Sequence, residues 1–159
     1  MKKLTILSAL GAIAGLTISN CIIYKKGKKK QTELAELADK HKDLFLMMNQ
    51  WVKTKQEGKS IDSYLKNKGY KKVAIYGMSF VGETLLRELK RSEIEVKYGI
   101  DKNAKGIYAD VNLVTLEDSF DEVDAIVITA ISYFDEIKKS ISKKIDCDIV
   151  SLENILYDL

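Results

Sequence analysis

Short β-rich segments alternate with amphipathic segments from Tyr70 to the C-terminus, and this alternation limits the possible folds more than any other feature. The expected strands are residues 72–76, 94–101, 111–114, 124–129 and 147–152, and the expected helices are residues 81–92, residues 133–144 and a short C-terminal helix. Strands that alternate with helices favour right-handed crossovers and a parallel sheet. We therefore predict an α/β domain with a five-stranded parallel sheet in the order 3-2-1-4-5, one half of a doubly wound fold with an extra edge strand.

The first predicted strand runs into the segment IYGMSFVGETLL, which resembles a dinucleotide-binding fingerprint without its middle glycine. Gly77 and Gly82 stand at the first and last positions of the G-x-G-x-x-G pattern, and Ser79 occupies the central one. We expect Gly77 to allow the sharp turn and Gly82 to let the helix pack closely on the sheet. The N–H groups at the start of this helix would attract a phosphate, with the Ser79 hydroxyl as an additional donor.

Two further loops should lie at the same edge of the sheet. Asp101 ends the second strand, 19 residues after Gly82, where an acid accepts hydrogen bonds from a ribose diol; the alternative is an ordinary turn aspartate. An acid there favours NAD or a nucleotide sugar over NADP, and Lys102 weakens that preference. Thr129 and Ala130 follow the fourth predicted strand, and Ser132 is the expected cap of the next helix. The candidate binding residues are thus Gly77, Met78, Ser79, Phe80, Val81, Gly82, Asp101, Lys102, Thr129 and Ala130.

No set of catalytic residues is visible in the sequence. Tyr64 and Lys68 have the Y-x-x-x-K spacing of short-chain dehydrogenases, but they precede the glycine-containing loop instead of following it. His41, the only histidine, lies within a helical stripe, and we interpret it as a contact residue. We expect no metal site, because the two cysteines lack metal-ligand spacing. Binding is therefore favoured over catalysis.

The N-terminal segment from Leu4 to Tyr24 contains 21 residues without a charge. As a helix it would span roughly 31 Å, which matches a bilayer core. Two lysines precede it and five follow it, which predicts a single-pass anchor in the cell membrane with the remaining chain in the cytoplasm. A cleaved signal peptide and a lipoprotein signal ending at Cys21 are the alternatives; the first usually has a shorter apolar region, and Asn20 fits the second poorly.

Residues 31 to about 57 have the spacing of one amphipathic helix. Its apolar stripe consists of Leu34, Leu37, His41, Leu44, Met48 and Trp51, widened by Ala38, Phe45 and Val52. We expect the stripe to pack against the chain's own domain or against a second copy in a homodimer. A short helix capped by Ser60 follows it.

The charge distribution separates the N-terminus from the rest. The formal net charge is +3, yet the first thirty residues hold seven lysines and no acid, so the remainder carries −4. The globular part therefore gives no indication of nucleic-acid binding. We predict three regions: an anchor with a basic flank at 1–30, an amphipathic helix with a short helix at 31–69, and an α/β domain at 70–159.

The segments GYKKVAIYGMSFVGETLLREL, YGIDKN, VDAIVITAISYFDEI and IVSLENIL together resemble the small Rossmann-like domains of bacterial polysaccharide biosynthesis proteins. These are similar to the N-terminal domains of nucleotide-sugar epimerases and dehydratases, and the similarity extends over about residues 45–159. It implies a nucleotide or nucleotide-sugar ligand at Gly77, Ser79, Gly82 and Asp101. The catalytic domain of such relatives has no counterpart in this chain.

The expected function is therefore a membrane-anchored protein that binds NAD or a nucleotide sugar and supports cell-envelope or capsular polysaccharide synthesis alongside separate enzymes. One alternative is a structural adaptor whose Rossmann-like domain holds no ligand. Another is a component of an NAD-dependent epimerase or dehydratase.

Overall fold

The computed structural model describes the backbone of residues 2–159 and the side chains of residues 24–159. The chain forms two compact units, Met1–Lys42 and Asp43–Leu159. The elements in chain order are α1 (Lys2–Gln56), α2 (Ile61–Asn67), β1 (Lys72–Tyr76), α3 (Phe80–Leu89), β2 (Glu95–Ile100), the 3-10 helix η1 (Ala104–Gly106), β3 (Leu113–Val114), β4 (Ala125–Ile128), the 3-10 helix η2 (Ile131–Tyr133), α4 (Phe134–Ile141), β5 (Asp148–Ser151) and α5 (Leu152–Asp158).

The second unit is built on a five-stranded parallel sheet in the order β3-β2-β1-β4-β5. This confirms the predicted α/β class and strand order. The central strand β1 pairs with β2 on one side and with β4 on the other, so the C-terminal ends of these three strands lie at one edge. The alternation of strand and helix along the chain was therefore sufficient to predict the topology.

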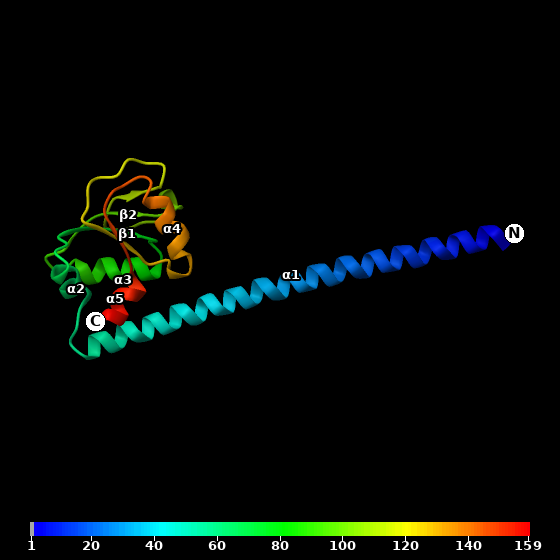
Figure 1. The fold of residues 1–159 in the computed structure, drawn as a ribbon, viewed down its shortest axis with the longest axis horizontal. Coiled ribbons are helices and arrows are strands. Elements are labelled where there is room, and N and C mark those ends of the chain that lie inside the picture. Colours follow the sequence, from blue (N-terminus) through cyan, green and yellow to red (C-terminus); the bar gives the residue numbers. More distant parts are fainter. Residues whose placement is uncertain (1) are drawn as a thin grey trace. The chain divides into compact units, whose positions relative to one another are not determined.

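One face of the sheet is covered by four helical segments. Buried side chains of α2, α3 and α5 pack on it together with Met47 and Trp51 from the C-terminal part of α1. Figure 1 shows α3 and α5 next to each other, apart from α4. The spacing of Val81, Leu85 and Leu89 presents one apolar side of α3 to this core.

The other face has a thinner cover. Ile137 and Ile141 of α4 pack there against Tyr76, Tyr98, Ile126 and Ile128 of the sheet. The connection from β3 to β4, residues 115–124, contains no helix, and it contributes only Leu116, Phe120 and Val123 to this core. The Tyr98 ring stacks on Phe120, with ring centroids 6.0 Å apart.

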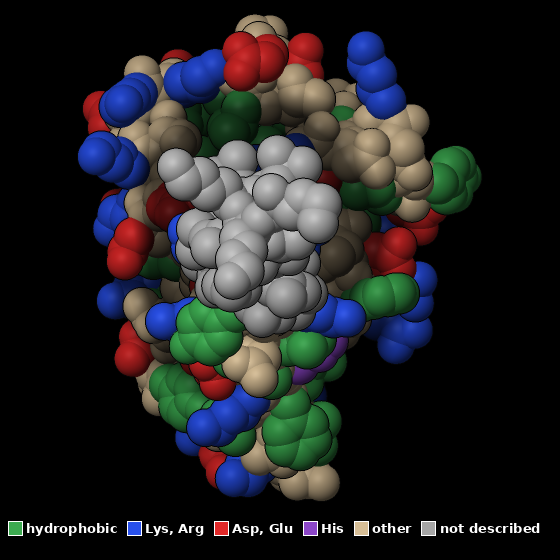
Figure 2. All heavy atoms as spheres, turned by 90° about the vertical axis from the view of Figure 1, so that its right-hand side faces the viewer, with side chains coloured by type: hydrophobic (Ala, Val, Ile, Leu, Met, Phe, Trp, Pro, Cys, Tyr) green, Lys and Arg blue, Asp and Glu red, His purple; other side chains and the backbone are tan. Residues whose placement is uncertain are grey.

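The predicted amphipathic helix is part of α1, and only the C-terminal end of its stripe packs on the chain's own domain. Trp51 is buried and Met48 is half-buried, whereas Leu34, Leu37, His41 and Leu44 are exposed. The fully buried position is Met47, which the predicted stripe omits, and Phe45 and Val52 are exposed. In Figure 2, hydrophobic side chains reach the surface among charged ones. The packed side of α1 is therefore centred on Met47, Trp51 and Thr54.

The predicted anchor, residues 4–24, lies outside the residues whose side chains are described, except for Tyr24. A search of the described residues finds no helical stretch apolar and long enough to cross a bilayer. The five lysines between Lys25 and Lys30 are all exposed.

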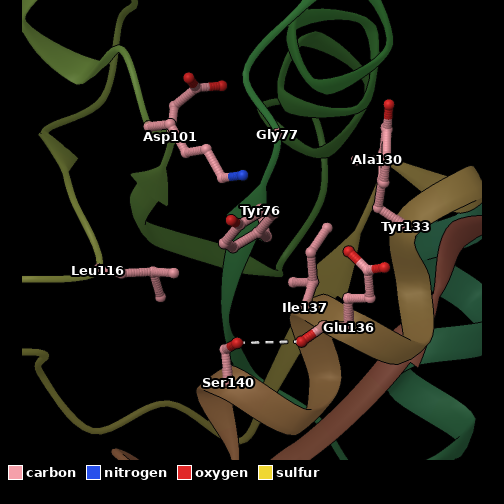
Figure 3. Close-up of a pocket in the computed structure, with 10 residues that line it drawn as sticks. Tyr76, Gly77, Asp101, Leu116, Ala130, Tyr133, Glu136, Ile137 and Ser140 are labelled. Carbon is pink, nitrogen blue, oxygen red and sulfur yellow. Dashed lines mark hydrogen bonds between the residues drawn. The ribbon is translucent and has the colours of Figure 1, made fainter.

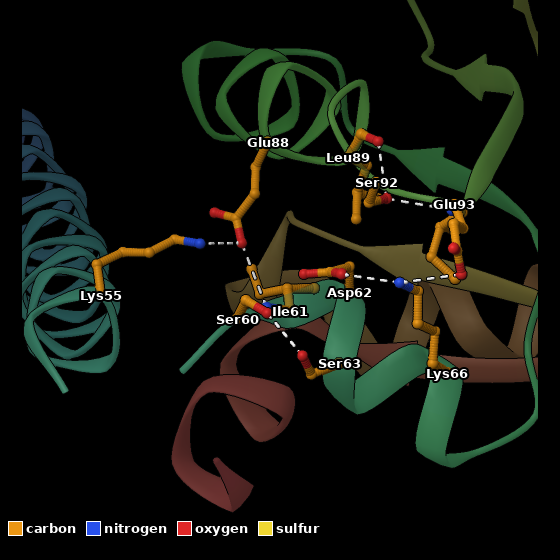
Figure 4. A network of polar contacts seen from close by, with 11 residues as sticks. Lys55, Ser60, Ile61, Asp62, Ser63, Lys66, Glu88, Leu89, Ser92 and Glu93 are labelled. Atoms are coloured by element: carbon orange, nitrogen blue, oxygen red, sulfur yellow. Dashed lines mark hydrogen bonds and ion pairs between the residues drawn. The ribbon is translucent and has the colours of Figure 1, made fainter. Parts of the chain in front are cut away.

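Glu88 of α3 joins three elements at the covered face (Figure 4). Its Oε2 accepts a hydrogen bond from Trp51 Nε1 at 2.9 Å, and its Oε1 lies 2.5 Å from Lys55 Nζ and 3.3 Å from the Ile61 backbone nitrogen. The single carboxylate therefore links the end of α1 and the start of α2 to α3.

Candidate functional site

The turn from β1 into α3 has the geometry that the two glycines predict. Gly77 has φ +93°, a conformation that L side chains rarely adopt, and a Cβ there would lie 2.8 Å from Thr129 Oγ1. A Cβ on Gly82 would lie 2.1 Å from the Gly77 carbonyl oxygen. The sharp turn at Gly77 is thus confirmed, whereas the close approach that Gly82 allows is to the backbone of this turn and not to a strand of the sheet.

The residues between the two glycines point in different directions. The Met78 side chain is 1% exposed and packs under the loop, where a Cβ on Gly99 would meet its Cγ at 2.8 Å. Ser79 is the exposed N-cap of α3, and its side chain makes no capping hydrogen bond. Phe80 is 90% exposed, whereas Val81 is buried. Of these four residues, only Ser79 presents an unbonded hydroxyl at the start of the helix.

Asp101 is bonded to this loop and to its own. Its Oδ2 accepts a hydrogen bond from the Met78 N–H at 2.8 Å, and its Oδ1 accepts one from the Asn103 N–H at 2.9 Å. The carboxylate therefore ties the end of β2 to the β1–α3 turn. Each ionised oxygen has lone pairs left, so Asp101 can still accept hydrogen bonds from a ligand.

The loop after β4 contributes one buried and one accessible residue. Thr129 is 5% exposed, and its Oγ1 lies 3.0 Å from the Tyr76 carbonyl oxygen and 2.6 Å from that of Gly77, to which it donates. Thr129 therefore supports the β1–α3 turn through the backbone carbonyls of that turn. Ala130 is half-buried. The predicted cap at Ser132 is wrong: Ser132 lies inside η2, and Tyr133 is the N-cap of α4. A 3-10 turn therefore precedes α4 and moves its start by one residue, from 133 to Phe134.

A pocket of about 400 Å³ opens at the C-terminal edge of the sheet, between α4 and the β3–β4 connection (Figure 3). Four predicted residues line it: Gly77, Asp101, Lys102 and Ala130. The prediction omitted Tyr76, Leu116, Tyr133, Glu136, Ile137 and Ser140. Met78, Ser79, Phe80, Val81, Gly82 and Thr129 do not line it.

The omitted residues differ in how far the sequence could have predicted their place in the pocket. Tyr76 ends β1 directly before Gly77, so the strand prediction already placed it at this edge. Three of them lie on α4 and could be predicted as pocket residues once that helix is placed beside the sheet: Glu136, Ile137 and Ser140. Leu116 comes from a segment without regular structure, and no periodic pattern marks it.

The Tyr76 ring is 4% exposed, and burial, followed by the nearby Asp101 charge, raises the pKa of its hydroxyl. The hydroxyl therefore stays protonated at neutral pH and can donate a hydrogen bond. Within the part of the chain that the structure describes, no cluster of His, Cys, Asp and Glu side chains is suited to a metal ion.

Comparison of the chain with protein-family models, with curated proteins and with solved structures gave no match.

Proposed function

We propose that this protein binds a nucleotide or a nucleotide sugar at the C-terminal edge of its sheet. The observation that carries the proposal is the pocket beside the Gly77 turn, with Asp101 fixed to that turn by the Met78 N–H. The β1–β2 crossover packs on one face of the sheet and the β4–β5 crossover on the other. The crossovers that follow β1 and β4 therefore leave these neighbouring strands toward opposite faces. In open parallel sheets, ligands bind in the crevice between the C-terminal ends of two strands that are related in this way.

The phosphate part of the ligand would bind at the start of α3. The first turn of a helix has N–H groups without intrahelical partners, and the helix dipole favours an anion there. The Ser79 hydroxyl makes no capping bond, so it is available as a further donor. Because the Met78 N–H is already bonded to Asp101, the anion site would begin at Ser79 instead of at the turn itself.

A role in bacterial cell-envelope or capsular polysaccharide synthesis is the cellular function that we propose. It is supported by the sequence resemblance to small Rossmann-like domains of that group and by the uncharged segment of residues 4–24 with its lysine-rich flank. We propose that this segment anchors the protein in the cell membrane and that the domain faces the cytoplasm. Separate enzymes would carry out the chemistry.

Calorimetric titration of the full-length chain with UDP, UDP-glucose, NAD and NADP tests ligand binding. We expect at least one of the first three to bind, and Lys102→Ala to weaken it about threefold through loss of a nearby positive charge. Lys105→Ala is the matched control, since Lys105 is an exposed lysine of the same loop that does not line the pocket. Absence of binding at millimolar concentration for all four nucleotides would refute the proposal.

A structural adaptor is the second candidate, and it rests on the exposed apolar side chains of α1. Leu34, Leu37 and Phe45 are 56%, 49% and 68% exposed, and exposed apolar side chains on a helix are typical of association surfaces. The same titration separates the two functions, because an adaptor without a ligand would bind none of the four nucleotides.

A further inference from the structure

The floor of the pocket carries a hydroxyl group that has no partner among the described residues. Tyr76 is 4% exposed, its ring packs in the core below α4, and its hydroxyl makes no hydrogen bond within the described residues. Every fully buried side-chain nitrogen or oxygen of those residues does have a partner. The Tyr76 hydroxyl is therefore reached from the pocket, and Figure 3 shows the side chain among Asp101, Leu116 and Ile137.

Such a group favours a ligand that supplies the missing hydrogen bond. A polar group in a largely apolar surrounding is poorly solvated, so pairing it on binding recovers most of the cost of its burial. Leu116 and Ile137 beside it are suited to the C–H surface of a ring. A tyrosine hydroxyl is protonated at neutral pH and can both donate and accept a hydrogen bond, and burial raises the pKa of Tyr76 further in the same direction.

The charges around the pocket indicate which part of a nucleotide enters it. Asp101 and Glu136 contribute carboxylates to the lining, and Lys102 is the single basic residue of that lining. A phosphate close to two carboxylates would be repelled. Carboxylates instead accept hydrogen bonds from hydroxyl groups, and the Ser140 hydroxyl already donates to the Glu136 backbone carbonyl.

We propose that the pocket receives an uncharged, hydroxyl-rich ring, the sugar part of the ligand, and that Tyr76 hydrogen-bonds a hydroxyl of that ring. The inference rests on the proposed nucleotide binding and adds the group that is recognised and the residue that recognises it. The phosphates remain outside the pocket, near Ser79 and the start of α3.

Tyr76→Phe tests the inference, because it removes the hydroxyl and keeps the buried ring. Tyr98→Phe is the matched control: Tyr98 is 3% exposed on the same face of the sheet, but its hydroxyl donates to the Asp121 carbonyl at 2.9 Å and does not line the pocket. Both variants and the wild-type full-length chain are titrated with UDP-glucose, UDP and NAD.

The pattern of losses identifies the bound ring. If the glycosyl ring occupies the pocket, Tyr76→Phe should weaken the affinity for UDP-glucose by about threefold to tenfold and leave the affinity for UDP unchanged. If the ribose ring occupies the pocket, Tyr76→Phe should weaken the affinity for every probe that binds by the same factor. Tyr98→Phe should bind each probe as the wild type does.

Two results would overturn the inference, and they are distinguishable. If the wild type binds at least one probe and Tyr76→Phe binds every one of those probes as tightly as the wild type does, the sugar assignment is wrong while nucleotide binding stands. If the wild type binds none of the probes, the proposed function is refuted, and the sugar assignment with it.

Discussion

The two faces of the sheet differ in how completely the crossovers cover them. The face below α3 is packed by residues from α1, α2, α3 and α5, and its large side chains such as Leu65, Leu85 and Leu89 are fully buried. The opposite face is covered by α4, the irregular segment 115–124 and two side chains of the α4–β5 connection, Ile145 and Cys147. The pocket lies on this second face, between α4 and segment 115–124.

The difference separates the parts of the domain that supply stability from the part that leaves space for a ligand. A helix in the β3–β4 connection would cover the sheet beside α4, where Leu116 now borders the pocket. Because segment 115–124 is irregular, the end of β1 stays accessible through Tyr76. The comparison predicts large stability losses from changes on the covered face and small ones around the pocket.

Leu85→Ala should produce the largest effect. Leu85 is fully buried on the covered face, and its truncation should lower the free energy of unfolding by about 3 kcal/mol through lost burial and the cavity that remains. Leu116→Ala is the matched change at the pocket, where the side chain is only half-buried, and we expect a loss of about 1 kcal/mol or less. Urea denaturation followed by circular dichroism measures both, and equal losses would show that the two faces are packed alike.

Glu88→Gln tests how the covered face holds the end of α1. Three donors now share the two carboxylate oxygens of Glu88, whereas a glutamine side chain has only one acceptor oxygen. We therefore expect a loss of about 2 kcal/mol in the free energy of unfolding. Trp51, the only tryptophan, lies at this junction, so its fluorescence maximum should shift to longer wavelength if the contact opens.

Glu83→Gln provides the control for this prediction. Glu83 lies on the same helix and pairs with Arg87 at 3.3 Å, but that pair is solvent-exposed, and exposed pairs contribute little. We expect a change below about 0.5 kcal/mol and unchanged tryptophan fluorescence. A loss as large as that of Glu88→Gln would mean that general charge balance, not the Trp51 and Ile61 contacts, accounts for the effect.

The parallel sheet and the glycine turn were predictable from sequence because each depends on local patterns. The packed side of α1 was not, since Leu44, Phe45, Leu46, Met47 and Met48 are consecutive apolar residues that point in every direction around a helix. Which of them is buried depends on which side of α1 faces the sheet, and the sequence of the helix alone does not determine that side. The spacing therefore selected Leu44 and Met48, whereas the domain buries Met47.

The candidate site was predictable to the extent that it is formed by strand ends. Gly77, Asp101 and Ala130 follow β1, β2 and β4 directly, and the strand order brings them to one edge. The wall formed by Leu116 was not predictable, because irregular segments are positioned by tertiary packing and not by periodicity. The bond from Met78 N–H to Asp101 likewise depends on the loop geometry and has no sequence signature.

Two tyrosines on the pocket face give the smallest and most specific test of the comparison. Burial, as the main cause, raises the pKa of Tyr98 to about 12, whereas tyrosine in an unfolded chain has a pKa near 10. The folded state thus holds this proton more tightly, so the contribution of Tyr98 is complete below about pH 10 and is lost as the pH rises toward 12. Between pH 8 and pH 11 the wild type should therefore lose about 1 kcal/mol more stability than Tyr98→Phe does.

Denaturant unfolding at pH 8, 10 and 11 measures this difference, with Tyr108→Phe as the control because the Tyr108 ring is 90% exposed.

At pH 8, Tyr98→Phe should also cost about 1 kcal/mol, since it leaves the Asp121 carbonyl without its hydroxyl donor. Tyr76→Phe should cost almost nothing at that pH, because the Tyr76 hydroxyl has no hydrogen-bond partner to lose among the residues that the structure describes. Equal losses for Tyr76→Phe and Tyr98→Phe would indicate that the Tyr76 hydroxyl already serves the fold, leaving it no separate role in the pocket.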